Sequence, residues 1–197
     1  MPGTTAADGA GDEAMRCIVV GVSGSGKSTF ASALARARGV PHVELDALYW
    51  LPGWIARERE DFRHLAAQAT GGDAWVADGN YSATRDLLWP RATHVVWLHY
   101  GRLTVLWRIV RRTLGRLVRR QTLWSGNRET FARAFLSRES PILWSMQTYD
   151  KHQRNYRALR ASGVYPQLVW VELRNPRQAQ ALLRAQRGQA RPGHRGA

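Results

Sequence analysis

Short apolar runs alternate with amphipathic helical patterns along most of the chain. Five of the runs have the length and composition of buried strands, and they cover residues 16–20, 42–45, 74–77, 93–98 and 168–173. Helical spacing predicts helices over 27–38, 57–69, 82–88, 102–120, 128–161 and 176–187. Strands separated by helices imply right-handed crossovers. The pattern therefore predicts an α/β fold with a parallel sheet covered by helices on both faces.

The two ends of the chain lack this periodicity. Residues 1–14 are small and polar, and residues 187–197 are rich in Gly, Pro and Arg, so we expect disordered tails there. The 172 residues between them, 15–186, suit a single domain. No apolar run approaches the roughly 20 residues of a membrane helix, and the start does not resemble a signal peptide. We therefore expect a cytoplasmic protein that does not enter a membrane.

The segment between the first strand and the first helix carries a phosphate-binding motif. Residues 21–28, GVSGSGKS, match G-x-x-x-x-G-K-[ST] in the context that this motif requires. Its glycines let backbone N–H groups turn inward, and the following helix adds its positive N-terminal end. We call residues 21–28 the phosphate loop and expect it to bind ATP or GTP.

The motif also assigns roles to individual side chains. Lys27 is expected to reach the β- and γ-phosphates and to act in catalysis, and the Ser28 hydroxyl is expected to ligate Mg²⁺. For Thr29, packing along the side of the helix is the stronger interpretation. The candidate nucleotide-binding residues are Gly21, Ser23, Gly24, Ser25, Gly26, Lys27, Ser28 and Thr29.

Two aspartates follow predicted strands, at the edge where α/β sheets bind ligands. Asp78 follows the third strand, where a carboxylate can hold Mg²⁺ through water, and Gly79 leaves room beside it. Asp46 ends the second strand and could accept the proton of an attacking hydroxyl or bind the acceptor. The alternative for each is that it caps a helix or a turn.

Arginines dominate the charge. The chain has 29 basic residues, of which only Lys27 and Lys151 are lysines, and its net charge of +14 favours anionic partners, although codon bias could produce the same skew. On a helix, Arg108, Arg112 and Arg116 would share one face. There they could neutralise a phosphoryl transition state from a mobile lid over about residues 102–160. The alternative is a basic helix that faces solvent or nucleic acid.

Aromatic residues and the single cysteine complete the pattern. Tyr49, Trp50 and Trp54 cluster just after Asp46, where they could stack on a planar ligand or simply cover the core. Cys17 lies inside an apolar strand, which indicates a buried, inert thiol.

Four segments together resemble a known family: GVSGSGKST, LDALYWLPGW, WVADGNYS and VVWLHYGRLTVLWRIVRR. They are similar to the adenylate-kinase-like P-loop proteins of the topology modulation protein family, over about residues 16–185. The resemblance implies a three-layer P-loop NTPase fold, a five-stranded parallel sheet of order 2-3-1-4-5, a helical Arg-rich lid, and ATP with Mg²⁺. Asp78-Gly79 resembles the strand-end Asp-Gly of nucleoside monophosphate kinases, but Asn80-Tyr81 replaces the Phe-Pro-Arg that would bind a monophosphate.

The sequence therefore predicts an ATP-binding phosphotransferase that acts on a small molecule or a nucleotide whose identity the motifs leave open. The alternative is a nucleotide-dependent protein that binds DNA or RNA through the arginine helix. No helix-turn-helix or RNA-binding aromatic motif is present, which favours the phosphotransferase.

Overall fold

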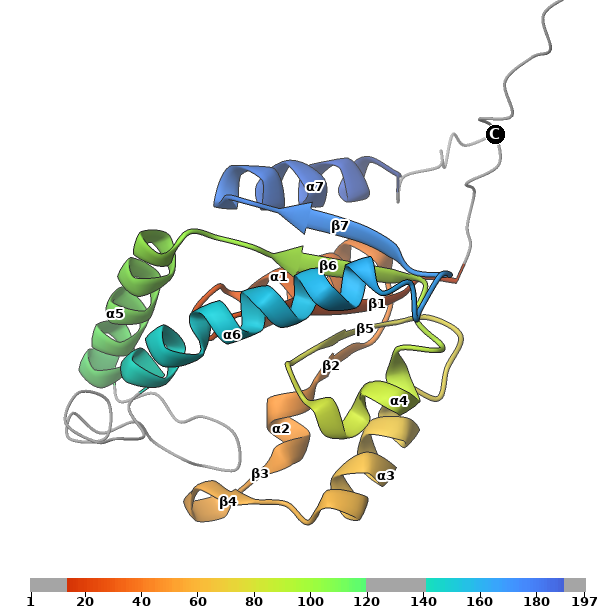
Figure 1. The fold of residues 1–197 in the computed structure, drawn as a ribbon, viewed down its shortest axis with the longest axis horizontal. Coiled ribbons are helices and arrows are strands. Elements are labelled where there is room, and N and C mark those ends of the chain that lie inside the picture. Colours follow the sequence, from red (N-terminus) through yellow and green to blue (C-terminus); the bar gives the residue numbers. More distant parts are fainter. Residues whose placement is uncertain (1–13, 120–140, 190–197) are drawn as a thin grey trace, which may run out of the picture.

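The computed structural model describes residues 14–119 and 141–189, which form one sheet flanked by helices (Figure 1). The sheet has five parallel strands in the order β2-β5-β1-β6-β7. Their bounds are Arg16–Gly21 for β1, His42–Glu44 for β2, Trp75–Asp78 for β5, His94–Leu98 for β6 and Val169–Leu173 for β7. Counted along the chain, this is the expected order 2-3-1-4-5. The structure is therefore the predicted three-layer α/β/α fold.

Each face of the sheet is buried beneath helices because side chains alternate along the strands. The helices that cover it are α1 (Lys27–Arg38) and α7 (Pro176–Gln189) on one face, and α3 (Arg59–Ala69), α4 (Arg85–Leu88) and α6 (Pro141–Ala161) on the other. Val19 lies on the first face in a buried cluster with Phe30. The preceding residue, Ile18, lies on the second face with Phe62 and Tyr156.

Helix α5 (Arg102–Arg119) lies beyond the carboxyl ends of the strands, where the lid is expected (Figure 1). Val105 and Ile109 on its inner side are 0% exposed, whereas Leu103 and Trp107 on its outer side are 83% and 61% exposed. The helix therefore packs one face against the edge of the sheet that carries the phosphate loop. Of the helix predicted over 128–161, the structure describes α6 from Pro141, and residues 120–140 lie outside the described part.

The segment after β2 differs from its prediction. The strand expected to run to residue 45 ends at Glu44, and Leu45 begins the short helix α2 (Leu45–Tyr49). Asp46 therefore lies in the first turn of a helix and does not end a strand. A small hairpin follows, formed by β3 (Trp50–Leu51), the 3₁₀ turn η1 (Pro52–Trp54) and β4 (Ile55–Ala56).

Other elements depart from their predictions by a few residues. The helix predicted over 82–88 is divided into the 3₁₀ turn η2 (Ser82–Thr84) and α4. Helix α7 continues to Gln189, so the tail predicted from residue 187 begins too early. The remaining residues of both predicted tails lie, apart from residue 14, outside the described part of the chain.

The single cysteine is buried in the core. Cys17 is 0% exposed, and burial raises the pKa of its thiol to about 12, so the thiol stays protonated as expected for an inert core residue.

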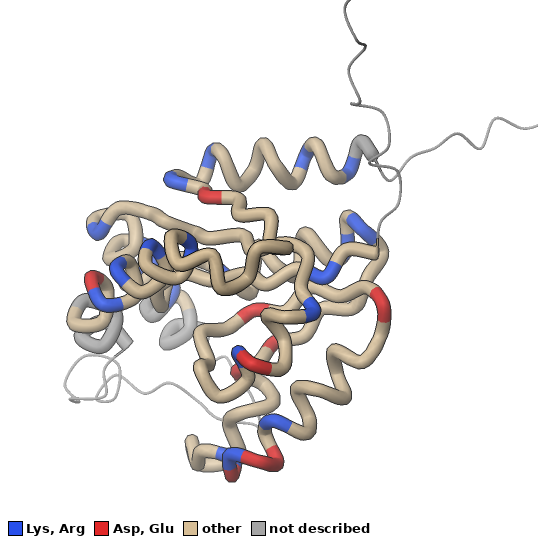
Figure 2. Tube along the Cα trace, turned by 45° about the vertical axis from the view of Figure 1, so that its right-hand side comes forward, with Lys and Arg blue, Asp and Glu red and all other residues tan. Residues whose placement is uncertain are grey.

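Within residues 14–119 and 141–189, no helix is both long enough and apolar enough to cross a bilayer. Basic positions recur along the chain trace, and acidic ones are fewer (Figure 2).

Candidate nucleotide-binding and phosphoryl-transfer site

The phosphate loop joins the end of β1 to the start of α1 through left-handed glycines. Gly24 has a φ of +81° and Gly26 a φ of +91°, values that L side chains rarely adopt. Ser25 N–H donates to the Val22 carbonyl at 3.1 Å, which closes the turn. No side chain caps the start of α1, so its first amides can serve an anion held in the loop.

Helix α5 rests directly on these glycines. A Cβ atom at Gly24 would lie 2.0 Å from Cγ1 of Ile109, and one at Gly26 would lie 2.4 Å from a terminal nitrogen of Arg108. The guanidinium of Arg108 also lies over the ring of Tyr100, 5.8 Å from its centroid. The structure thus places Arg108, one of the predicted catalytic arginines, at the phosphate loop.

Charged groups of both signs converge on Lys27. Burial lowers the pKa of its ammonium group, nearby Asp46 and Asp78 act to raise it, and Arg112 acts to lower it. The Nζ atom donates to the Val22 carbonyl at 3.2 Å, so the lysine folds back over its own loop. Four of the predicted site residues, Lys27, Asp46, Asp78 and Arg112, are therefore close enough to interact electrostatically.

Asp78 is buried and holds two partners. The Ser28 hydroxyl donates to its Oδ2 atom at 2.7 Å, and Nε2 of His42 donates to its Oδ1 atom at 2.7 Å. Asp78 is only 1% exposed. Because Ser28 donates its proton to Asp78, its oxygen lone pairs remain available to a cation. His42 had no predicted role, since only the parallel pairing of β2 with β5 brings it to Asp78.

Asp46 meets a tyrosine from the segment after β5. The Tyr81 hydroxyl donates to Oδ1 of Asp46 at 2.5 Å, and burial together with the Asp46 charge raises the pKa of Tyr81. The ring of Tyr49 packs against those of Tyr81 and Phe62, with centroids 4.7 and 5.1 Å away. Since Phe62 is 0% exposed, Tyr49 covers the core, one of the two roles considered for the aromatic cluster.

Asn80 fastens the phosphate loop to β5. Its side-chain amide donates to the Gly21 carbonyl at 2.6 Å, and its Oδ1 atom accepts from Gly21 N–H at 3.4 Å. The Tyr156 hydroxyl, from α6, donates to the same Oδ1 atom at 2.9 Å. Asn80, one of the two residues that replace the Phe-Pro-Arg of monophosphate kinases, thus positions Gly21, the first residue of the phosphate loop.

Helix α6 adds residues that the sequence analysis missed. The Tyr149 hydroxyl donates to the Tyr100 carbonyl at 2.7 Å, just after β6. Together with the bond from Tyr156 to Asn80, just after β5, it fixes the inner side of α6 to the ends of these two strands. Gln153 lies between Tyr149 and Tyr156 on the same side of α6 and is 5% exposed. Neither its amide nitrogen nor its amide oxygen has a hydrogen-bond partner in the described residues. Next to it, the pKa of His152 is lowered by burial and by the charges of Lys27 and Lys151.

Three further predicted residues have different outcomes. Thr29 is exposed and does not pack along the helix side as expected. Arg116 belongs to α5, but its side chain lies outside the described part of the chain. Ser25 is 0% exposed, and its hydroxyl has no partner in the described residues.

Comparison with known proteins identifies the family and the fold of the chain. A family model described as an AAA domain matches residues 17–194. The chain belongs to this family. The structure of a gluconokinase from Sinorhizobium meliloti 1021 is similar, with 20% sequence identity and a TM-score of 0.50, over 90% of this chain and 92% of that chain. A search of curated proteins gives no match. Family and fold together make the chain a P-loop NTPase with a kinase-like structure.

Proposed function

We propose that the protein is an ATP- and Mg²⁺-dependent phosphotransferase that moves the γ-phosphoryl group to a hydroxyl of a small molecule. The observation that carries this proposal is the 2.7 Å hydrogen bond from Ser28 to Asp78, beside Lys27. A loop serine bonded to a buried strand-end carboxylate is the arrangement that P-loop enzymes use around magnesium. The adenylate-kinase-like motifs WVADGNYS and LDALYWLPGW support assignment to the topology modulation proteins.

The donor side of the site fits a magnesium–nucleotide complex. The loop amides and Lys27 would bind the phosphates, and the Ser28 oxygen with Asp78, through water, would hold the cation. Both supply oxygen atoms, which Mg²⁺ prefers. Bound Mg²⁺ would neutralise charge that develops on the phosphates. Arg108, which lies against Gly26, would bind phosphate oxygens, and Arg112 would add positive charge beside Lys27.

We assign the acceptor side to residues of α2 and α6. Tyr81 occupies Oδ1 of Asp46 and fixes that carboxylate, so Oδ2 is the atom that we assign to the proton of the attacking hydroxyl. Gln153 of α6 offers a buried amide with both its donor and its acceptor unused by the described residues. An amide of this kind suits hydroxyl or carbonyl groups. A small polar acceptor is also consistent with the gluconokinase that shares the fold.

The test measures ADP formation with Mg·ATP, with and without each member of a panel of nucleosides, nucleotides and small hydroxylated metabolites. At least one compound should raise ADP formation above the rate without acceptor, and Lys27→Ala should abolish that increase. Removal of Mg²⁺ with a chelator should do the same. If no compound raises the rate, the phosphotransferase proposal fails.

The arginines of α5 offer a matched pair of variants. Arg108 contacts the phosphate loop, whereas Arg111 is exposed and lies over the ring of Trp107 at 5.3 Å. Arg108→Ala should lower kcat by about 10²-fold or more, as removal of a transition-state donor does. Arg111→Ala should leave kcat nearly unchanged. Equal effects would contradict a specific role for Arg108.

A second candidate is nucleotide-dependent binding of nucleic acid. It is favoured by an exposed row of basic residues along α6, which contains Lys151, Arg154, Arg157 and Arg160. Contacts of this kind make affinity fall steeply with salt. Duplex DNA binding that persists at about 150 mM salt and changes with ATP would support this candidate. Binding that vanishes at that salt concentration or ignores ATP would count against it.

A further inference from the structure

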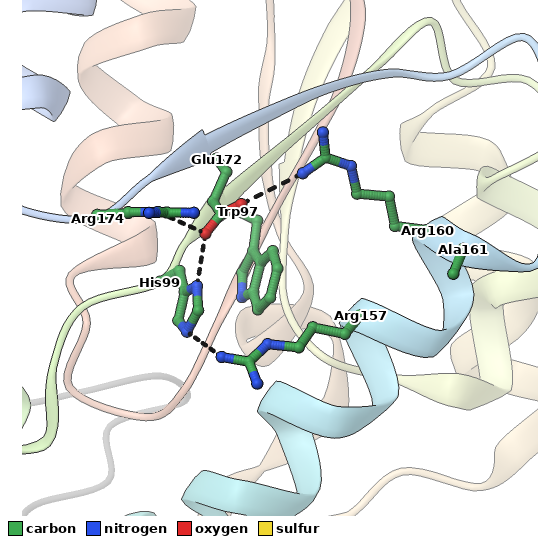
Figure 3. Close-up of a pocket in the computed structure, with 7 residues that line it drawn as sticks. All are labelled: Trp97, His99, Arg157, Arg160, Ala161, Glu172 and Arg174. Carbon is green, nitrogen blue, oxygen red and sulfur yellow. Dashed lines mark hydrogen bonds and ion pairs between the residues drawn. The ribbon is translucent and has the colours of Figure 1, made fainter.

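A pocket of about 510 Å³ lies apart from the phosphate loop, on the face of the sheet that carries α6 (Figure 3). Its walls come from α6 and from the carboxyl-end portions of β6 and β7. The ring of His99 stacks on that of Trp97 with centroids 4.3 Å apart and an interplanar angle of 3°. Because Trp97 is 2% exposed and held in the core, the stacked rings form a rigid wall of the pocket.

One carboxylate organises the polar groups of the pocket. Glu172 accepts hydrogen bonds from Nδ1 of His99 at 2.7 Å and Nε of Arg174 at 3.0 Å on one oxygen. Its other oxygen accepts from Nη1 of Arg160 at 3.2 Å. Burial acts to raise the pKa of Glu172, but the bonds from His99 and Arg174 lower it, so the group stays ionised at neutral pH.

The third arginine of the pocket has no carboxylate. Because Nδ1 of His99 donates to Glu172, its Nε2 atom is an acceptor, and Nη2 of Arg157 donates to it at 3.4 Å. No ion pair joins Arg157 to an acid in the described residues. Three guanidinium groups therefore face a single carboxylate, which leaves an excess of two positive charges at the pocket.

We propose that this pocket binds a small phosphate dianion, free or as a phosphate monoester, between Arg157, Arg160 and Arg174. The excess charge matches a dianion, and planar guanidinium groups from α6 and from the end of β7 approach it from two sides. Arg160 and Arg174 have side chains 48% and 72% exposed, so they can turn toward a ligand from solvent. This site is separate from the phosphate loop and does not depend on the proposed transfer reaction.

Inorganic phosphate, titrated onto the full chain by calorimetry at low salt, tests the site. The titration uses Lys27→Ala as background, which weakens phosphate binding at the loop. Phosphate should still bind one site per chain, and adding Arg157→Gln should weaken it about tenfold or more, the loss expected for a charge-assisted hydrogen bond. Arg154→Gln, an exposed α6 arginine outside the pocket, is the matched control and should have little effect.

A second variant separates the proposal from a loss of folding. Glu172→Gln keeps an acceptor oxygen but removes the negative charge, so phosphate should bind more tightly, which an unfolded protein would not do. Three results would overturn the proposal: no phosphate binding in the Lys27→Ala background, equal effects of Arg157→Gln and Arg154→Gln, or weaker binding in Glu172→Gln. Competition of phosphate by duplex DNA at much lower concentration would instead assign these arginines to nucleic acid.

Discussion

Ser28 and Asp78 lie 50 residues apart in the chain, yet their side chains are joined by a hydrogen bond of 2.7 Å. The bond links the first turn of α1 to the last residue of β5. The parallel pairing of β1 with β5 places the ends of these two strands side by side, and α1 follows β1 through the phosphate loop. It gives the serine oxygen a fixed direction before any ligand arrives.

The first prediction concerns this pair. Asp78→Asn keeps the shape of the side chain but removes the negative charge behind Ser28. The Mg²⁺ concentration that gives half-maximal turnover should therefore rise by about 10- to 100-fold, as for other residues that orient a metal ligand. Binding of ATP without Mg²⁺ should change much less. Magnesium titrations of ADP formation measure the first effect and calorimetry with EDTA the second. An unchanged magnesium requirement would remove Asp78 from the metal site.

The second prediction concerns the attachment of the phosphate loop. Asn80→Ala removes both contacts to the Gly21 backbone, so it should weaken nucleotide binding and cost about 1–3 kcal/mol of stability, the usual cost of stranding buried polar groups. Tyr156→Phe removes only the hydroxyl that donates to Asn80 and should have the smaller effect on both quantities. Urea unfolding and nucleotide titration provide the two measurements. If Tyr156→Phe weakened binding more than Asn80→Ala, the loop would not depend on Asn80.

The third prediction compares two left-handed glycines. Gly24→Ala and Gly39→Ala both place a side chain at positive φ, but only the first would meet Ile109, at 2.0 Å, since nothing lies within 4 Å of a Cβ at Gly39. Gly24→Ala should therefore displace α5 and abolish nucleotide binding. Gly39→Ala should cost only its backbone strain, of order 1–3 kcal/mol, and should still bind nucleotide. Proteolysis of α5 and nucleotide titration distinguish the two variants.

The fourth prediction concerns acid stability. Burial and the charges of Lys27 and Lys151 lower the pKa of His152 below its ordinary value of 6.5. Below pH 6.5 the unfolded chain therefore binds a proton at His152 more readily than the folded chain, and stability is lost as the pH falls through the folded pKa. The free energy of unfolding should fall less between pH 7.5 and 5 in His152→Gln than in the original protein. His64→Gln, at an exposed position of α3, is the control, and an identical pH dependence in both variants would contradict the prediction.

The sheet and the phosphate loop were predictable from the sequence because their signals are local. Each strand is a short apolar run, and the loop motif occupies eight consecutive residues between a strand and a helix. The order of the strands followed from the family resemblance and is confirmed. The hairpin after α2 was missed because two-residue strands are too short to show an alternating pattern.

The surroundings of the loop were less predictable because they depend on contacts between distant residues. His42 reaches Asp78 across 36 residues, and Tyr156 reaches Asn80 across 76. Asp46 was placed at a strand end because the run of apolar positions continues through Leu45, but Leu45 begins a helix. The arginines of α5 were found from their spacing, and only the folded structure distinguishes Arg108, at the loop, from Arg111, in solvent.

The contact from Tyr156 through Asn80 to Gly21 also has a consequence for how the protein is made. The nucleotide motif is complete once residue 28 has been synthesised, but its final hydrogen-bonded support comes from a helix that ends at Ala161. During translation the ribosome will therefore release the motif long before the residues that secure it. A nascent chain should therefore reach its full nucleotide affinity only after α6 has emerged.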